Sequence, residues 1–222
     1  MGSASIVPVK ALAVSKKRLA TILSPKERAD LTLSMLDDVL HALKLSEIAL
    51  TVVISPDPIV DKIAKKTNTI FLSEEQIGLN NALDQATKWL SKKGLDSILI
   101  LPSDIPLVSP EDITGILDLG AEEKSVVLSS SRNGGTNAFF KRPPNLVPTF
   151  FGPDSFNRHL KESLTRNIKP KIFESNRIGL DIDSAEDLKE FSLIPSNTIS
   201  KKYLEKLDRL QTSKKQLDFA SA

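Results

Sequence analysis

Short, almost continuously apolar runs are the feature that most restricts how this chain can fold. The runs IALTVVI (48–54) and SILIL (97–101) lack the polar alternation of a half-exposed strand and are too short for buried helices. They predict strands covered on both faces, as in a parallel sheet between helices. Further strands are expected at 5–9, 69–72, 125–131, 137–142, 170–175 and 178–183.

Signals for helix starts alternate with these strands. Ser24, Pro25 and Glu27 form the signature of a capped helix start, and the apolar stripe that follows has helical spacing. This alternation predicts the α/β class, a mostly parallel mixed sheet with helices on both faces, which binds ligands beyond the carboxyl ends of its strands. Helices are expected at 24–43, 58–67, 79–94, 109–120, 155–167 and 184–192.

The length of 222 residues fits one α/β catalytic domain, predicted over residues 1–195. Residues 196–222 are polar and rich in lysine, and we expect them to form a C-terminal helix or tail. Leu204, Leu207 and Leu210 would give such a helix a weak apolar face. A peripheral helix, a frayed tail and a homodimer contact all stay open.

Composition excludes several classes of function. The chain has no cysteine and only two histidines, which excludes disulfides, thiolate chemistry and a histidine-rich zinc site. A net charge of +2 does not indicate a nucleic-acid partner. No segment approaches the ~20 apolar residues of a membrane span, and the N-terminus does not resemble a signal peptide. We therefore expect a cytoplasmic protein.

One aspartate follows a predicted strand, and two more lie on another. Asp104 comes directly after the strand at 97–101, where a turn or capping role is the alternative to a functional one. Asp181 and Asp183 lie two apart on a segment expected to be extended, so their side chains should share one face. Ser184 and Asp187 already form a capping box, so neither aspartate is needed there. Three carboxylates suit Mg²⁺.

Lysine and arginine residues gather in the loop that follows the first predicted strand. Lys10, Lys16 and Arg18 could neutralise a triphosphate, because this loop of an α/β sheet commonly holds nucleotide phosphates. A solvated basic surface is the alternative. Neither a Walker loop nor a GxGxxG fingerprint is present.

Two glycine-containing turns complete the set of candidate segments. Gly134 and Gly135 allow close approach of a ligand, or a hairpin turn between two strands. The stretch FGPDS (151–155) could lead into a helix N-terminus that binds an anion, with Asp154 as a plain N-cap as the alternative. His159, on the following helix, is expected to be a packing residue rather than a base.

Several stretches, in a fixed order along residues 5–191, together resemble the 2-phospho-L-lactate guanylyltransferases of coenzyme F-420 biosynthesis, whose relatives use phosphoenolpyruvate. Each stretch is weak alone, and the ordered set is specific. They are VPVKALAVSKKRLA, LSPKERADLTLSMLDDVL, GLNNAL, LPSDIPLVSPEDI, GGTNAFF, FGPDSFNRHL and LDIDSAEDL.

The resemblance implies a fold like that of the GT-A nucleotidyltransferases and the transfer of GMP from GTP to 2-phospho-L-lactate or phosphoenolpyruvate, with release of pyrophosphate. It implies that Mg²⁺ binds residues that match Asp104, Asp181 and Asp183, which together with Lys10 and Arg18 would be the catalytic residues. The implied nucleotide-binding residues are Pro8, Lys10, Lys16, Arg18, Asn80 and Asp104, and the implied acceptor-binding residues are Thr136, Gly152 and Ser155.

Two other functions stay open at this point. One is a different nucleotidyltransferase or glycosyltransferase on the same fold, because fold alone does not define function. The other is a non-catalytic nucleotide-binding module, although such a module would not need all three aspartates. The residues do not distinguish lactate from enolpyruvate, or guanine from another base.

Overall fold

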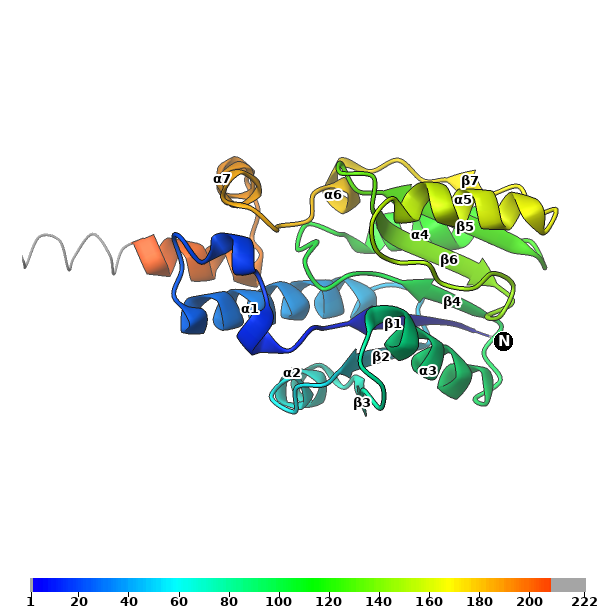
Figure 1. Ribbon diagram of the computed structural model, residues 1–222, viewed down its shortest axis with the longest axis horizontal. Coiled ribbons are helices and arrows are strands. Elements are labelled where there is room, and N and C mark those ends of the chain that lie inside the picture. The colour runs from blue at the N-terminus through cyan, green and yellow to red at the C-terminus, as the bar shows by residue number, and fades with distance from the viewer. Residues whose placement is uncertain (1, 209–222) are drawn as a thin grey trace, which may run out of the picture.

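A single sheet of seven strands forms the centre of the computed structural model, which describes residues 2–208 (Figure 1). The strand order is β3-β2-β1-β4-β6-β5-β7, and β6 is antiparallel to both of its neighbours while every other pair is parallel. The predicted mostly parallel mixed sheet is confirmed. The strands are β1 Ser3–Pro8, β2 Leu50–Ser55, β3 Ile70–Ser73, β4 Ser97–Ile100, β5 Ser125–Ser130, β6 Thr136–Arg142 and β7 Lys171–Ile172.

Helices cover both faces of the sheet, as the uninterrupted apolar runs predict. In β2, Val53 points into the core on one face while Val52 and Ile54 point into the core on the other, and all three are buried. The first face carries α1 Pro25–Lys44, α2 Val60–Thr67, α4 Pro110–Leu119 and α6 Asn176–Gly179; the second carries α3 Leu79–Ser91 and α5 Ser155–Thr165.

Capped starts fix where three helices begin. Complete capping boxes form at α1, between Ser24 and Glu27, and at α4, between Ser109 and Asp112. A third forms at α7 Ala185–Leu193, between Ser184 and Asp187. Each box satisfies backbone N–H groups that a helix start otherwise leaves without partners. The predicted boxes at α1 and α7 are confirmed, and α4 begins where a helix was expected.

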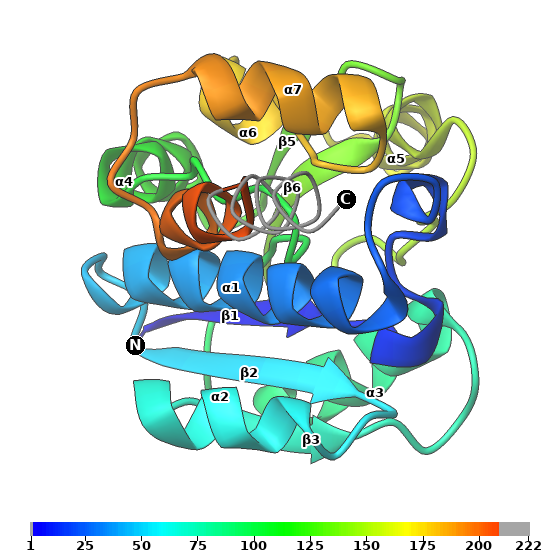
Figure 2. The ribbon, with the colours of Figure 1, turned by 90° about the vertical axis from the view of Figure 1, so that its left-hand side faces the viewer.

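The C-terminal segment packs on the body of the protein. Residues 199–208 are helical, and Figure 2 shows this helix, in red-orange, between α1 and α7. Leu204 is buried in a third apolar cluster with Leu31 of α1 and Phe191 of α7. Asp38 of α1 caps the helix by accepting bonds from the N–H and hydroxyl groups of Ser200. Leu204 and Leu207, from the predicted apolar face, therefore pack against the rest of the same chain, while Leu210 lies outside the described residues.

Three predicted elements differ from the structure. Residues 178–183 do not form a strand: Ile178 and Gly179 end the short α6, and the following residues are outside the sheet. Two side-chain contacts favour the helical turn instead: the Ser175 side chain caps α6, and Asn137 of β6 donates to the carbonyl of Ile178. The strand expected at 170–175 is only Lys171–Ile172. The helix expected at 79–94 ends at Ser91, before Gly94 takes a positive φ.

Within residues 2–208, none of the helices has the length and apolar character needed to cross a membrane.

Candidate active site

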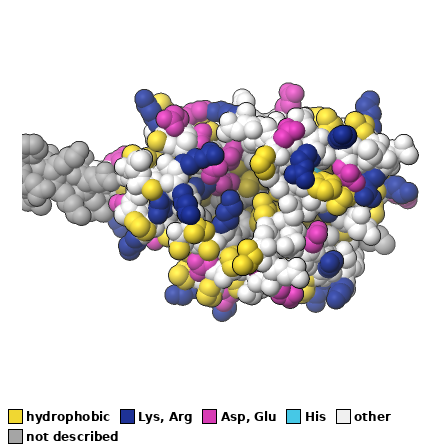
Figure 3. Space-filling model, viewed as in Figure 1, with side chains coloured by type: hydrophobic (Ala, Val, Ile, Leu, Met, Phe, Trp, Pro, Cys, Tyr) yellow, Lys and Arg dark blue, Asp and Glu magenta, His cyan; other side chains and the backbone are white. Residues whose placement is uncertain are grey.

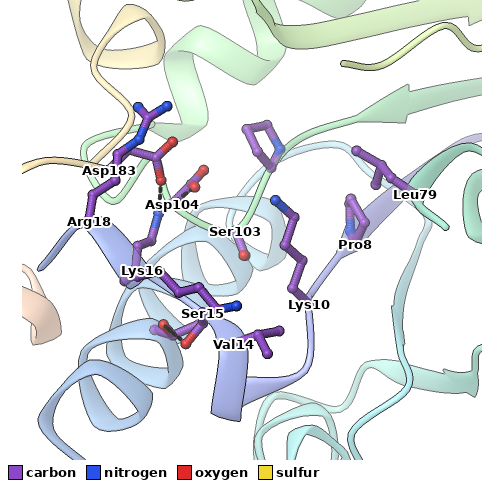
Figure 4. Close-up of a pocket in the computed structure, with 13 residues that line it drawn as sticks. Pro8, Lys10, Val14, Ser15, Lys16, Arg18, Leu79, Ser103, Asp104 and Asp183 are labelled. Atoms are coloured by element: carbon purple, nitrogen blue, oxygen red, sulfur yellow. Dashed lines mark hydrogen bonds and ion pairs between the residues drawn. The ribbon is translucent and has the colours of Figure 1, made fainter. Parts of the chain in front are cut away.

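A cleft of about 400 Å³ opens at the carboxyl edge of the sheet. It lies where β1 and β4 end, at the position expected for a ligand in an α/β sheet. The cleft gathers six of the predicted residues, namely Pro8, Lys10, Lys16, Arg18, Asp104 and Asp183 (Figure 4). The other lining residues are Val14, Ser15, Lys17, Thr32, Leu79, Pro102 and Ser103.

Lys16 joins two of the predicted carboxylates. Its ammonium donates to Asp104 Oδ2 at 2.6 Å and to Asp183 Oδ1 at 2.8 Å, and Figure 4 shows the side chain pointing toward both. The Lys16 side chain is only 6% exposed. Its backbone adopts the left-handed conformation, with φ of 48°, which is unusual for a residue other than glycine. This turn directs the lysine into the cleft between two short 3-10 helices, Leu12–Val14 and Lys17–Leu19.

The ion pairs outweigh the cost of burial for both partners. Burial by itself lowers the pKa of Lys16, but the charges of Asp104 and Asp183 and their hydrogen bonds raise it above its ordinary value. Burial likewise opposes ionisation of Asp183, yet Lys16, with Lys10 and Arg18, lowers the pKa of this carboxyl below its ordinary value. The pair is therefore charged at neutral pH.

Asp181 lies beside this pair in a different environment. Its Oδ1 accepts a bond of 3.1 Å from Asn137 Nδ2, and Asn137 also donates to the Ile178 carbonyl. Burial raises the pKa of Asp181, and the negative charges of Asp104 and Asp183 add to this effect. The N–H of Ile182 donates to the Asp104 carbonyl at 3.0 Å, which ties the two acidic segments together without a strand pairing.

The carboxylates are of the ligand type that a divalent cation prefers, but they are not arranged around a common point. Among residues 2–208, no group of three or more Asp, Glu or His side chains is arranged to hold a metal ion. Carboxylate oxygens are nevertheless the ligands that Mg²⁺ prefers, and Lys16 shows that positive charge is stabilised between Asp104 and Asp183. A metal ion and the Lys16 ammonium would compete for the same oxygens.

Further basic side chains surround the acidic group. Lys10, Lys17 and Arg18 line the cleft together with Lys16. Figure 3 shows Lys and Arg side chains gathered around Asp and Glu side chains on this face, over the N-terminal loop. The small net charge of +2 thus conceals a local concentration of positive charge, as an anion site requires.

The three predicted acceptor-binding residues form a second group near the start of β6. Ser155 Oγ donates to Thr136 Oγ1 at 3.1 Å, and both side chains are buried. Gly152 takes φ of 134° and its carbonyl accepts from the Ser155 N–H. These residues do not line the 400 Å³ cleft. The connection between the two groups runs through Asn137, which follows Thr136 and binds Asp181.

The turns around this second group differ in part from expectation. The hairpin predicted at Gly134 and Gly135 is confirmed by the antiparallel β5–β6 pair, and Gly134 has φ of 76°. A side chain at Gly135 would collide with Ser131 Oγ, since an added Cβ would lie 2.8 Å from it. Asp154 occupies the N-cap position of α5, but its side chain makes no capping bond and instead accepts from Asn157.

Asn80, a predicted nucleotide-binding residue, is bound to the backbone of Phe151. Its Nδ2 donates to the Phe151 carbonyl at 3.0 Å, and its Oδ1 accepts from the Phe151 N–H at 2.8 Å. The amide therefore ties the start of α3 to the segment that carries Gly152. Leu79, the residue before Asn80, is the part of this segment that lines the cleft.

Sequence reasoning missed several residues that hold the site in place. Ser15 and Thr32 line the cleft and are joined by a bond of 3.1 Å between their hydroxyls. Asp57, in the loop that follows the neighbouring strand β2, accepts from the Leu12 N–H and so anchors the basic loop. The sequence carries no signal for these contacts, because each joins residues that are far apart in the chain. Serine, threonine and aspartate are also common on protein surfaces, so their presence alone does not indicate a structural role.

The fold is that of nucleotide-diphospho-sugar transferases. A crystal structure described as such a transferase, from Desulfovibrio desulfuricans G20, superposes with a TM-score of 0.77 at 16% identity, and covers 95% of this chain and 97% of that one. At this identity the likeness concerns the fold alone.

The sequence is more specific than the fold. Residues 3–218 match the profile of the family described as guanylyl transferase CofC like, and the chain belongs to this family of nucleotidyltransferases. A phosphoenolpyruvate guanylyltransferase from Rubrobacter xylanophilus is 38% identical over 83% of this chain and 90% of its own length. A 2-phospho-L-lactate guanylyltransferase from Methanocaldococcus vulcanius is 36% identical over 91% of this chain and 90% of its own length.

Proposed function

We propose that this chain transfers the guanylyl group of GTP to the phosphate of 2-phospho-L-lactate or phosphoenolpyruvate, as its relatives are named to do. The products would be the guanosine-diphosphoryl acid and pyrophosphate, and the reaction would serve coenzyme F-420 biosynthesis. Membership of the guanylyl transferase family supports the reaction class.

One observation in the structure carries the proposal. The carboxyl edge of the sheet brings basic residues of the N-terminal loop into one cleft with two carboxylates, and Lys16 contacts both of these at 2.6 and 2.8 Å. A nucleoside triphosphate needs such a concentration of positive charge, because its phosphates and the departing pyrophosphate are strongly anionic. Lys10, Lys17 and Arg18 are available for this contact.

The proposed chemical step needs no general base. An oxygen of the acceptor phosphate, already ionised at neutral pH, attacks the α-phosphorus of GTP. A new P–O bond forms while the bond from the α-phosphorus to the bridging oxygen breaks, and its electron pair leaves with pyrophosphate. The main barrier is repulsion between anions, which Lys10 and Arg18 would reduce. The absence of a histidine among the residues that line the cleft is consistent with this step.

Asp104, Asp181 and Asp183 would hold Mg²⁺, which would supply further neutralisation of phosphate charge when bound. The chain itself supplies a positively charged or hydrogen-bonding partner for each of these carboxylates. Lys16 does this for Asp104 and Asp183, and Asn137 orients Asp181. Thr136, Gly152 and Ser155 would bind the acid through hydroxyl and backbone groups.

The direct test is release of pyrophosphate from GTP and Mg²⁺ with each acid, measured side by side on the purified chain. Release with one acid would establish the reaction and identify the acceptor. Replacing GTP by ATP or CTP would test the base. If folded protein releases pyrophosphate with neither acid, the proposed function is wrong and another nucleotidyltransferase, glycosyltransferase or binding role takes its place.

A further inference from the structure

His159 lies directly behind the two hydroxyl groups proposed to bind the acceptor. It is on α5, four residues after Ser155 and on the same face of the helix, and it has no exposed surface. Its ring stacks on Phe139 with centroids 4.3 Å apart. Both ring nitrogens have partners: the Phe150 N–H lies 2.8 Å from Nε2, and Thr136 Oγ1 lies 3.0 Å from Nδ1.

The backbone contact determines which ring nitrogen carries the hydrogen. A backbone N–H is always a donor, so Nε2 must accept from Phe150 and is unprotonated. A neutral imidazole has one hydrogen, which must then be on Nδ1. Burial, with the charges of Lys141 and Arg158, lowers the pKa of His159 to about 4, so the ring is neutral at pH 7. Nδ1 therefore donates to Thr136 Oγ1.

Counting hydrogens around Thr136 shows that one hydroxyl hydrogen has no partner in this group. The threonine oxygen accepts from His159 Nδ1 and from Ser155 Oγ, and these two bonds occupy its two lone pairs. Its own hydrogen must then be donated elsewhere, and no third partner for either hydroxyl is found among residues 2–208. With the other imidazole tautomer, Thr136 would instead donate to the ring and would have no hydrogen left for a ligand.

We propose that His159 is a positioning residue that keeps a hydroxyl hydrogen of the Thr136–Ser155 pair available to the anionic acceptor. This inference rests on the proposed function, because it takes the phosphate or carboxylate of the acid as the ligand. The imidazole does not touch the acid. It acts through Thr136, by accepting from the backbone on one side and donating to the hydroxyl on the other.

Nitrogen-15 NMR of the wild-type protein tests the tautomer without any substitution. The chain has only two histidines, His159 and the exposed His41, so the ring signals can be assigned by replacing His41. At pH 7 we expect the Nδ1-protonated, neutral ring for His159. An Nε2-protonated ring or an imidazolium would overturn the proposal.

Three variants test the effect on the acceptor. His159→Phe retains the stacked ring and loses both hydrogen bonds, so the Thr136 hydroxyl is no longer held in the orientation that directs its hydrogen to the acid. The KM for the acid should rise about tenfold, the usual scale for losing a hydrogen bond from that hydroxyl to a charged group. The KM for GTP should stay within about twofold. His159→Asn retains a donor near the Nδ1 position, and should restore much of the KM for the acid although it loses the ring stack. His41→Phe is the matched control.

The ranking of these variants separates positioning from stability. If KM for the acid simply follows the melting temperature, so that His159→Asn is the worse variant in both, the proposal is overturned. A double-mutant cycle gives a second criterion. In a Thr136→Val background, His159→Phe should have no further effect on KM for the acid, whereas independent, multiplying effects would contradict action through Thr136. If His159→Phe does not fold, His159→Asn in both backgrounds and the NMR result decide.

Failure of the proposed function would look different. A wild-type protein that releases pyrophosphate with neither acid overturns the reaction itself. An active wild-type protein whose KM for the acid is unchanged in His159→Phe overturns only the role of His159.

Discussion

Lys16 is a single residue on which the charge balance of the cleft depends. Its single positive charge is shared between Asp104 and Asp183, and its side chain is only 6% exposed, so neither carboxylate lies unpaired in the cleft. Because the ammonium is buried while the two carboxylates are 23% and 44% exposed, loss of both carboxylates would leave a buried charge without a counter-ion. Lys16 is predicted from the sequence to contact the triphosphate, and in the structure it also binds both carboxylates.

Removing either carboxylate should abolish most activity without unfolding the protein. Asp104→Ala and Asp183→Ala should each lower kcat/KM about 10²–10³-fold, the range for loss of a group that stabilises developing charge. Pyrophosphate release and circular dichroism would be measured together. Asp118→Ala, on the exposed side of α4, is the control. Turnover near the wild-type rate in both variants would remove the metal and catalytic assignments.

Lys141 makes the stability of the protein depend on pH in alkaline solution. It is buried on β6, its ammonium donates to the Val147 carbonyl, and burial lowers its pKa to about 8. Between about pH 8 and the ordinary value of 10.5, the folded state binds fewer protons at this residue than the unfolded state, so its contribution to stability rises with pH.

The corresponding variant is Lys141→Met. The melting temperature of the wild type relative to this variant should increase between pH 8 and pH 10.5, by a few degrees. Thermal unfolding of both proteins across this range checks the sign. A constant or falling difference would show that Lys141 keeps an ordinary pKa in the folded protein.

For single residues, the sequence predicted the position correctly where the residue directly follows a predicted strand. Asp104, Lys10 and Arg18 line the cleft as predicted. Asn137 and His159 could not be assigned their contacts, because each depends on a partner that only the fold brings near. Lining the cleft does not test a role, and the ligand-binding and catalytic roles of all the predicted site residues, Asp181, Thr136, Gly152 and Ser155 included, stay predictions.

At the scale of elements, Asp112 joins two helices that support the acidic segment. It completes the capping box of α4 and also accepts two bonds, at 2.7 and 2.8 Å, from Arg177 of α6. Ser175, the cap of α6, donates to the same carboxylate at 2.9 Å. The position of α6, and through it of Asp181, therefore depends on a residue of a helix 65 positions earlier in the chain.

Asp112→Ala should lower the free energy of unfolding by about 2 kcal/mol, since it removes a cap and leaves Ser175 and the half-exposed Arg177 without their partner. Asp187→Ala, which removes the capping box of α7, should cost about 1 kcal/mol and serves for comparison. Urea unfolding measures both. Equal effects would show that the contact between α4 and α6 contributes nothing beyond the cap.

The elements themselves were largely predictable, for physical reasons that also explain the exceptions. Buried strands and capped amphipathic helices carry their own signals, so β2, β4, α1 and α4 were found. Residues 180–183 alternate buried and half-buried side chains as a strand does. The alternation was real, but it reflects packing of Leu180 and Ile182 in the third apolar cluster, without a neighbouring strand.

At the scale of the whole molecule, the C-terminal segment belongs to the packed structure at least as far as residue 208. The helix at 199–208 covers the cluster that contains Leu31, Met35 and Phe191, and Asp38 receives three hydrogen bonds from its first residues. The division of the chain at residue 195 stays a prediction, and these contacts do not favour a dispensable tail.

Deleting residues 196–222 should therefore lower the melting temperature by about 5 °C or more, because it exposes apolar side chains and leaves Asp38 buried without its partners. Deletion of residues 209–222 alone is the comparison that isolates the helix. Thermal unfolding of both proteins is the measurement. An unchanged melting temperature in the longer deletion would show that the packing of this helix adds no stability.

The single antiparallel strand has a consequence for how acceptor preference could change in evolution. Because β6 runs antiparallel to β4, residues in the second half of β6 pair with β4, through Ile98–Lys141, Leu99–Phe140 and Ile100–Phe139, and the first residues of β6 extend past the last paired residue of β4. The position of the proposed acceptor-binding residue Thr136 relative to the cleft is therefore tied to a strand register, which can change only in whole residues. A shift by one residue would turn Phe139 and Phe140 to the wrong faces. We therefore expect a change to an acid of different size to arise from substitutions in the β5–β6 hairpin, because β6 cannot shift gradually along β4.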